Sequence, residues 1–169
     1  MDKPTFWKLI DSTRKLAEGN LDDHVKLLRE RLQSLEPEDI VQFDKLFRED
    51  WIRAYTWDLW GAAYIIGGGC SDDGFMDFRG WLISKGEEAY ENALKDPESL
   101  IKVVKEEEGC KYEGFQYVAS QAWENKTGKG MDQFPDSGLH QPRQPLGQPW
   151  AEDSDELERR FPKLSKKFS

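Results

Sequence analysis

Apolar residues recur at intervals of three and four along most of residues 1–127, and this spacing constrains the fold more than any other feature. In one segment it forms an unbroken stripe of Leu21, Val25, Leu28, Leu32 and Leu35. Side chains at such intervals share one face of an α-helix, and strand-like alternation never lasts more than a few residues in this chain. The sequence therefore predicts a mainly α-helical protein.

One predicted helix, residues 53–66, is unlike the others because it has no continuous polar side. Its apolar residues include Trp57 and Trp60, and a helix that is apolar all round usually lies at the centre of its domain. The glycines at 67–69 end it, since glycine readily adopts left-handed backbone angles, and Ser71 is typical of the N-cap of a following helix. We therefore expect an all-α, single-domain multi-helix bundle around this central apolar helix.

The chain divides into three segments by composition. Residues 1–127 form the predicted helical core domain, and residues 128–150 form a proline-rich segment that we expect to be extended and packed on the core. Proline lacks a backbone N–H and therefore disfavours both helices and central strands. Residues 151–169 are expected to form a short C-terminal helix and tail. The side chains expected to hold the proline-rich segment against the core are Leu139, Leu146 and Trp150.

The chain is acidic, with 33 Asp and Glu residues against 24 Lys and Arg residues and a formal net charge of −9. This balance disfavours binding to nucleic acid or to anionic membranes, because both depend on lysine and arginine. A basic protein is the electrostatically favoured partner. The longest weakly polar stretch, residues 59–70, is about half the length that a membrane crossing needs, and the N-terminus has no apolar signal-peptide core. We therefore expect a cytoplasmic protein that does not bind membranes.

The residues that usually carry nucleophilic or metal chemistry are sparse and scattered. Cys70 and Cys110 have no second cysteine or histidine at ligand spacing, so we expect free thiols, no metal site and no cofactor. The two histidines, His24 and His140, have no serine, cysteine or carboxylate at the spacing of a nucleophile and its base. We expect His24, which borders the apolar stripe, at the surface or at its edge. These observations weigh against an enzyme and leave no catalytic residue to name.

Residues 51–81 hold four of the seven tryptophans, with aspartates and arginines placed between the rings. Charged side chains are almost never fully buried unless they are paired. They therefore either pair with one another inside the core or line a cleft, and the sequence leaves both alternatives open. The candidate binding site or buried polar cluster comprises Arg53, Tyr55, Trp57, Asp58, Trp60, Ser71, Asp72, Asp73, Arg79 and Trp81.

Asp58 is the most demanding residue of this cluster, because the predicted helix places it between tryptophans, where an unpaired carboxylate would be costly. Arg79 lies on the next predicted helix, which the glycine turn folds back. We expect Asp58 to contact Arg79, or to be satisfied through Ser71 or a tryptophan N–H. Asp72 and Asp73 occupy a first helical turn, where their negative charges would repel a phosphate group. Aspartates at this position are more typical of helix capping than of metal binding.

Three motifs resemble a known family. They are Ala54-Tyr55-x-Trp57-Asp58-Leu59-Trp60-Gly61, Gly68-Gly69-Cys70-Ser71-Asp72-Asp73-x-Phe75-x-x-Phe78-Arg79-x-Trp81 and, near the end, Arg160-Phe161-Pro162-x-Leu164. In these residues, and over most of positions 1–125, the chain is similar to the bacterial family known as domain of unknown function 4240. The resemblance implies the family's fold. It implies no activity and no catalytic residue, because none is established for the family.

Two functions fit these observations. The preferred one is a non-enzymatic cytoplasmic interaction or regulatory protein, immunity-like in manner, that presents an acidic surface to a basic partner. The alternative is a small-molecule-binding or hydrolytic protein that uses Tyr55, Asp58, Asp72, Asp73 and Arg79 in a tryptophan-lined cleft. Solvent exposure discriminates between them, because side chains that are sealed from solvent and bonded only to one another would exclude the cleft.

Overall fold

The computed structural model describes residues 1–152 and 155–168, and the chain is all-α in these residues, as the periodicity predicted. Positions 153, 154 and 169 of the predicted C-terminal segment lie outside the described residues. One isolated parallel bridge pairs Thr56 with Leu146. Among the described residues, no helix combines the length and the apolar character needed to cross a membrane.

Three helices form an N-terminal layer: α1 (Lys3–Leu16), α2 (Leu21–Gln33) and α3 (Pro37–Arg53). Each begins at a local signal. The side chains of Asp2 and Asn20 accept hydrogen bonds from backbone N–H groups in the first turns of α1 and α2, and α3 begins with a proline, whose missing N–H is not needed there. The apolar stripe predicted along α2 packs into the core of this layer.

A glycine turn joins α4 (Trp57–Gly67) to α5 (Asp72–Ser84). Gly68 adopts a left-handed φ of 65° that ends α4, and the Ser71 hydroxyl accepts a hydrogen bond from a backbone N–H in the first turn of α5. The turn and the cap are therefore confirmed. The predicted helix start at residue 53 is wrong, because Thr56 is the N-cap of α4 and its hydroxyl accepts a hydrogen bond from the first turn.

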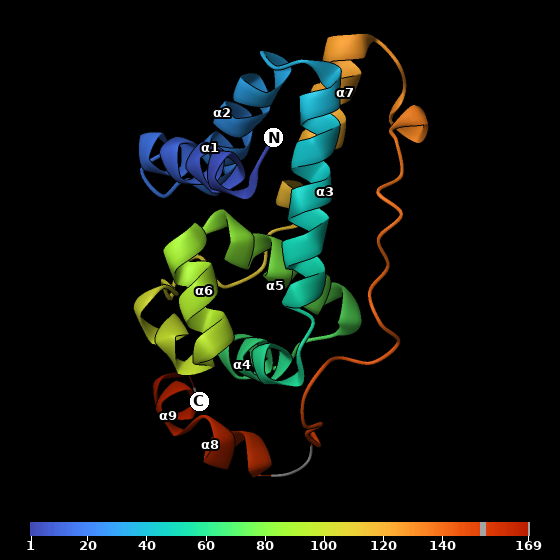
Figure 1. Cartoon of the computed structure of the whole chain (residues 1–169). Coiled ribbons are helices and arrows are strands. Elements are labelled where there is room, and N and C mark those ends of the chain that lie inside the picture. The colour runs from blue at the N-terminus through green and yellow to red at the C-terminus, as the bar shows by residue number, and fades with distance from the viewer. Residues whose placement is uncertain (153–154, 169) are drawn as a thin grey trace.

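The second half of the core consists of shorter elements. Helix α6 (Glu87–Lys95) and the 3₁₀ helix η1 (Pro97–Lys102) follow α5 and pack against each other. A second 3₁₀ helix, η2 (Glu113–Tyr117), leads into α7 (Val118–Thr127), which packs against α2 and α3 and completes the N-terminal layer (Figure 1). A single turn, η3 (Met131–Gln133), follows α7.

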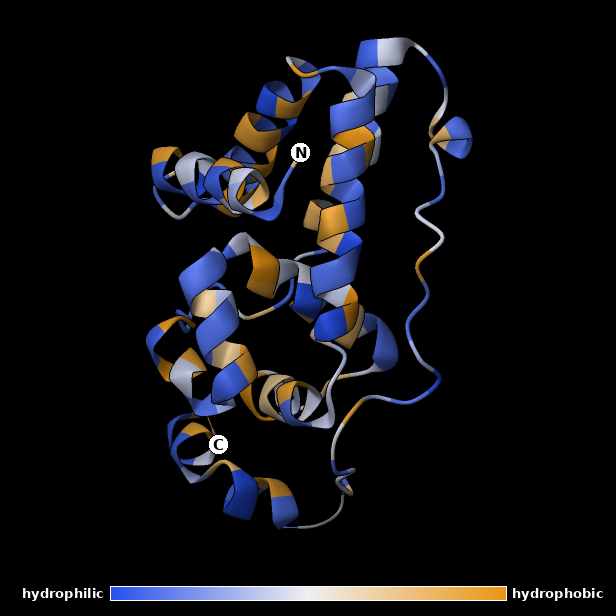
Figure 2. Ribbon diagram, in the orientation of Figure 1, coloured by the Kyte–Doolittle hydropathy of each residue, from blue (hydrophilic) through white to orange (hydrophobic). Residues whose placement is uncertain are grey.

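The proline-rich part of the chain is extended, as predicted. Residues 134–150, called the strap below, run without a helix along the outside of α3 toward α4 (Figure 1). Figure 2 shows the strap as mainly hydrophilic, with isolated hydrophobic positions. The strap is therefore held at a few points rather than by a continuous apolar face.

Two short helices, α8 (Glu156–Arg160) and α9 (Pro162–Phe168), pack under α4 (Figure 1). The sequence predicted one helix here, because segments this short hold too few apolar positions to show a period. Gly61 of α4 permits their close approach, since a Cβ added there would lie 2.8 Å from Cδ2 of Leu157 and 3.2 Å from the ring of Phe161.

The core is continuous, and α5 contributes more buried residues than any other helix of the described chain. Phe78 and Trp81 of α5 are completely buried. Helix α4, which is apolar all round, lies between α5 and the two C-terminal helices and buries Leu59 and Ala62. Its Trp60 is only partly buried, on the side that faces the strap.

Candidate functional site

A cleft of about 370 Å³ opens where the strap crosses the starts of α4 and α5. Aromatic and charged side chains line its core side, and glutamine, arginine and proline side chains of the strap line the other side. The lining residues are Tyr55, Trp57, Trp60, Asp72, Phe75, Met76, Arg79, Gln141, Arg143, Gln144 and Pro145. We call this hollow the strap cleft.

Backbone hydrogen bonds and one indole hold the strap at the cleft. The N–H of Leu146 donates to the carbonyl of Tyr55 at 3.0 Å, and the N–H of Trp57 donates to the carbonyl of Leu146 at 2.9 Å. Trp150 Nε1 donates to the carbonyl of Trp57 at 2.8 Å. Trp150 therefore anchors the strap as predicted, whereas the Leu146 side chain is 62% exposed and acts through its backbone.

The aromatic wall of the cleft is a stack of three rings. Trp57 and Trp60 lie with centroids 5.6 Å apart and planes 11° from parallel, and Trp60 and Phe75 lie 5.1 Å apart at 10°. Trp60 Nε1 donates to the carbonyl of Cys70 at 3.0 Å, which fixes its ring plane. The wall thus presents the ordered and partly exposed rings of Trp57 and Trp60, whereas Phe75 is buried and belongs to the core.

Arg79 is the most unusual residue of the lining, because only 1% of it is exposed. Its Nη1 donates to the carbonyl of Trp51 at 3.1 Å, and its Nη2 donates to Oε1 of Gln141 on the strap at 3.0 Å. The guanidinium carbon lies 3.6 Å from the ring centroid of Trp51 and 4.7 Å from that of Tyr55. Burial lowers the pKa of Arg79 to about 10, so the side chain keeps its charge at neutral pH.

The predicted contact between Asp58 and Arg79 is wrong. Asp58 Oδ1 accepts a hydrogen bond from Arg160 Nη1 at 3.0 Å, and no carboxylate among the described residues lies within ion-pair distance of Arg79. The reason is the later start of α4, which puts Asp58 in the first turn, where it is exposed and faces the C-terminal helices. The alternative through Ser71 is also wrong, since that hydroxyl caps α5.

The structure separates the other predicted site residues. Asp72 lines the strap cleft, but the exposed Asp73 does not. Arg53 turns away and pairs with Glu91 of α6, with N–O distances of 2.6 and 3.0 Å. Trp81 is sealed in the core, so five of the ten predicted residues meet in the cleft: Tyr55, Trp57, Trp60, Asp72 and Arg79.

Sequence reasoning missed the residues that complete the cleft. Phe75 precedes Arg79 by one helical turn, and this spacing was a usable signal. Gln141 and Arg143 carried no signal, because their place in the site depends on where the strap crosses the core.

His24, predicted at the surface, is instead buried between α1 and α2. Its Nε2 lies 3.1 Å from the carbonyl of Ile10 and 3.0 Å from the hydroxyl of Thr13. Burial lowers the pKa of this imidazole to about 4, and the positive charges of Arg14 and Lys85 add to the effect. The packing of α2 against α1 therefore buries His24, which lies at the edge of the apolar stripe along α2.

Cys70 and Cys110 are free and buried. Burial raises the pKa of both thiols, that of Cys110 to about 12. In the described part of the chain, no three His, Cys, Asp or Glu side chains gather in a group that could hold a metal ion.

Comparison with known proteins places the chain in a family. The model of the family described as "Protein of unknown function (DUF4240)" matches residues 1–125, which include α1 to α6 and most of α7. No curated protein and no solved structure matches the chain. The matched region contains every core-side residue of the strap cleft, whereas the strap lies beyond it. The chain belongs to the DUF4240 family of proteins of unknown function.

Proposed function

We propose that the protein is a non-enzymatic binding protein whose strap cleft takes up a small ligand with a flat apolar part and an anionic group. The observation that carries this proposal is Arg79, a buried and charged side chain in the cleft lining with no carboxylate partner among the described residues. The cleft volume, about 370 Å³, lies within the range of small-molecule sites.

The charge of Arg79 supports the anionic part of the ligand. Its present partners are neutral: two backbone carbonyls and the amide oxygen of Gln141. A carboxylate acceptor adds the attraction of opposite charges to the hydrogen bond from the guanidinium, and planar arginine–carboxylate pairs can form two parallel hydrogen bonds. A ligand carboxylate that takes the place of the Gln141 oxygen therefore compensates a buried charge that the protein itself leaves unpaired.

The rings support the apolar part. Trp57, Trp60 and Tyr55 are each only partly buried and line the same cleft. Aromatic surface of this kind is stabilised by stacking against a flat ligand, by about 0.5–1.5 kcal/mol beyond the area that is buried. An aromatic carboxylate of the size of an indole derivative combines both requirements.

The lining also supports binding over hydrolysis. It contains no serine, cysteine or histidine, so it offers stacking and hydrogen bonds rather than a nucleophile and a base. Gln141 comes from the strap, and its displacement by a ligand would couple occupancy of the cleft to the position of residues 134–150 on the outside of the core. This coupling suits a regulatory protein.

The test compares indole-3-acetate with indole-3-acetamide, which differ in charge but hardly in shape. We expect the carboxylate to raise the melting temperature and to change tryptophan fluorescence, and the amide to bind at least about tenfold more weakly, because it brings no charge to Arg79. Equal binding of both probes, or of neither, would contradict the proposal.

A pair of variants locates the binding. Replacing Gln141 by Ala removes the acceptor that competes for Arg79 and should tighten binding of indole-3-acetate. Replacing the exposed Gln133 by Ala makes the same chemical change in η3, outside the cleft, and should leave binding unchanged. If both variants behave alike, the ligand binds elsewhere.

A second candidate is an acidic docking face for a basic partner, in the manner of an immunity protein in the cytoplasm. Its supporting observation is Asp77 on α5, whose pKa is raised by burial and further by repulsion from Glu113 and Asp73. A basic partner would relieve this repulsion. Capture from native lysate should return a basic protein that elutes with salt, and replacing Asp73 and Glu113 by Asn and Gln should abolish its capture.

A further inference from the structure

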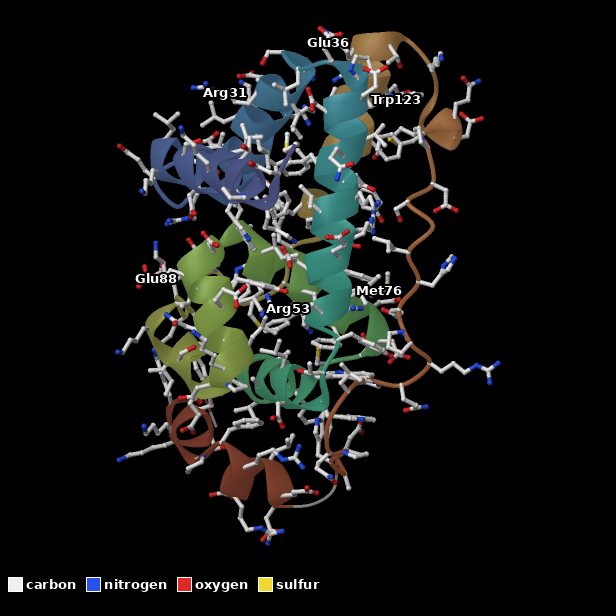
Figure 3. All side chains as sticks on the ribbon, viewed as in Figure 1. Arg31, Glu36, Arg53, Met76, Glu88 and Trp123 are labelled. Atoms are coloured by element: carbon white, nitrogen blue, oxygen red, sulfur yellow. The ribbon has the colours of Figure 1, made fainter. Side chains whose placement is uncertain are left out.

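A second pocket, of about 680 Å³, lies between the end of α1, the first half of α6 and η1. It is far from the strap cleft: Figure 3 labels Glu88 of this pocket and Met76 of the cleft on opposite sides of the molecule. In a chain of net charge −9, its lining gathers five basic side chains: Arg14, Lys15, Lys85, Lys102 and Lys105. We call it the basic pocket.

Two polar atoms of this pocket are buried and have no hydrogen-bond partner in the part of the chain that the structure describes. Among the described residues, three buried side-chain nitrogen or oxygen atoms lack a hydrogen bond, and two of the three belong to the lining: Nε of Arg14 and Oγ of Ser99. Each such atom costs free energy, because water is removed and nothing replaces it. The two atoms come from different elements, α1 and η1, and meet at the same pocket.

The positive charges of the pocket are only partly compensated. Arg14 Nη2 lies 3.2 Å from Asp11 Oδ1, and Lys85 Nζ and Lys105 Nζ lie 3.4 Å and 4.0 Å from the two carboxylate oxygens of Glu108. Lys15 and Lys102 are exposed and form no ion pair within the described chain.

The lining acids, Asp11, Glu87 and Glu88, are fewer than the bases. Charges of the lining also act on the buried His24: after burial, Arg14 and Lys85 lower the pKa of its imidazole, and Asp11 raises it.

We propose that the basic pocket is a recognition site for a small phosphate-bearing molecule. A phosphate group accepts hydrogen bonds at several oxygens, so it offers acceptors to the donors of this lining, among them the unpaired Nε of Arg14, the Ser99 hydroxyl and the Lys85 ammonium. The volume leaves room for more than the phosphate. No aromatic side chain lines the pocket, so a polar phosphorylated compound, such as a sugar phosphate or an inorganic polyphosphate, fits better than a stacked nucleobase.

The experiment uses the full chain with pyrophosphate, glucose 6-phosphate and glucose, each at constant ionic strength so that screening does not change. We expect the two phosphates to raise the melting temperature at millimolar concentration and glucose to have no effect. A stronger response to pyrophosphate than to glucose 6-phosphate would assign an inorganic polyphosphate, and the reverse order would assign a sugar phosphate. Absence of binding by both phosphates would overturn the proposal.

Matched variants distinguish the pocket from general charge. The double variant K15Q/K102Q removes two exposed and unpaired lysines from the pocket and should weaken phosphate binding by at least about tenfold. The control K26Q/K126Q removes two exposed lysines outside this lining, with the same change in net charge. If the control loses as much affinity, the binding is non-specific and the proposal is wrong.

Ser99→Ala gives an independent test. Since the hydroxyl has no hydrogen-bond partner among the described residues, its removal should not lower the melting temperature without phosphate, yet it should weaken phosphate binding severalfold. A loss of stability in the absence of phosphate would show that the hydroxyl serves the fold, which would contradict its assignment to a ligand.

Discussion

Asp58 and Arg160 connect α4 to the C-terminal helices: Asp58 Oδ1 accepts a hydrogen bond from Arg160 Nη1 at 3.0 Å, although 102 residues separate them in the chain. Arg160 also donates to the carbonyls of Gln148 at 2.7 Å and Pro149 at 3.2 Å, and to Glu156 at 2.6 Å. Arg160 therefore connects α4, the end of the strap and α8, whereas Asp58 contributes a single exposed carboxylate that accepts one of these hydrogen bonds.

This asymmetry predicts unequal effects of the two partners. Replacing Asp58 by Asn should lower the free energy of unfolding by less than about 1 kcal/mol, because the carboxylate is exposed. Replacing Arg160 by Gln should cost more, about 1–3 kcal/mol, because two carbonyls and two carboxylates lose the hydrogen bonds that Arg160 donates. Urea denaturation measures both values, and equal losses would contradict this role of Arg160.

Gly61→Ala should destabilise the protein although alanine is the better helix former. The added methyl would lie 2.8 Å from Leu157 Cδ2 and would push α8 and α9 away from α4. Overpacking of this kind costs about 1–3 kcal/mol. Gly67→Ala is the matched control on the same helix, since its Cβ would find its nearest neighbour, Lys111 Nζ, at 3.7 Å. Thermal unfolding should therefore show a lower midpoint for the first variant and not for the second.

The strap should depend on the backbone of Leu146 and not on its side chain. Leu146→Pro removes the N–H that donates to Tyr55 and should free the strap, with a loss of about 1 kcal/mol and faster cleavage of residues 134–150 by protease. Leu146→Ala keeps the N–H and removes a side chain that is 62% exposed, so it should behave like the wild type. Faster cleavage of the alanine variant would show that the side chain matters after all.

His24 predicts a loss of stability in mild acid. Its pKa is about 4 in the folded protein and about 6.5 in the unfolded chain, so between these values the unfolded chain binds more protons. The contribution of His24 is complete above about pH 6.5 and falls as the pH drops toward 4, by roughly 3 kcal/mol at most.

Urea denaturation between pH 4 and 7 measures this slope, and His24→Gln supplies the reference. Asp44 and Asp50 titrate in the opposite sense, since burial raises the pKa of both carboxyl groups, but they are common to both proteins. The difference between wild type and variant therefore isolates His24. A difference that does not change with pH would contradict the buried, neutral imidazole.

Much of the fold could be predicted because its signals are short-range. The stripe along α2, the left-handed Gly68 and the Ser71 cap each depend on residues within one or two helical turns. The candidate site could be predicted only in part. The predicted start of α4 was too early, and this error placed Asp58 in the middle of the helix instead of in its exposed first turn.

The local pattern of residues was enough to establish an all-α chain, the glycine turn and Ser71 cap between α4 and α5, and the aromatic character of residues 51–81, because helices form from interactions between near neighbours. The partners of the charged groups could not be established in this way. Arg79 meets Gln141 across 62 residues and Asp58 meets Arg160 across 102, and both meetings depend on where the strap and the last two helices pack. Such long-range packing is driven by burial of apolar surface and leaves no periodic signal in the sequence. It therefore determined which charged side chains are paired and which face a pocket.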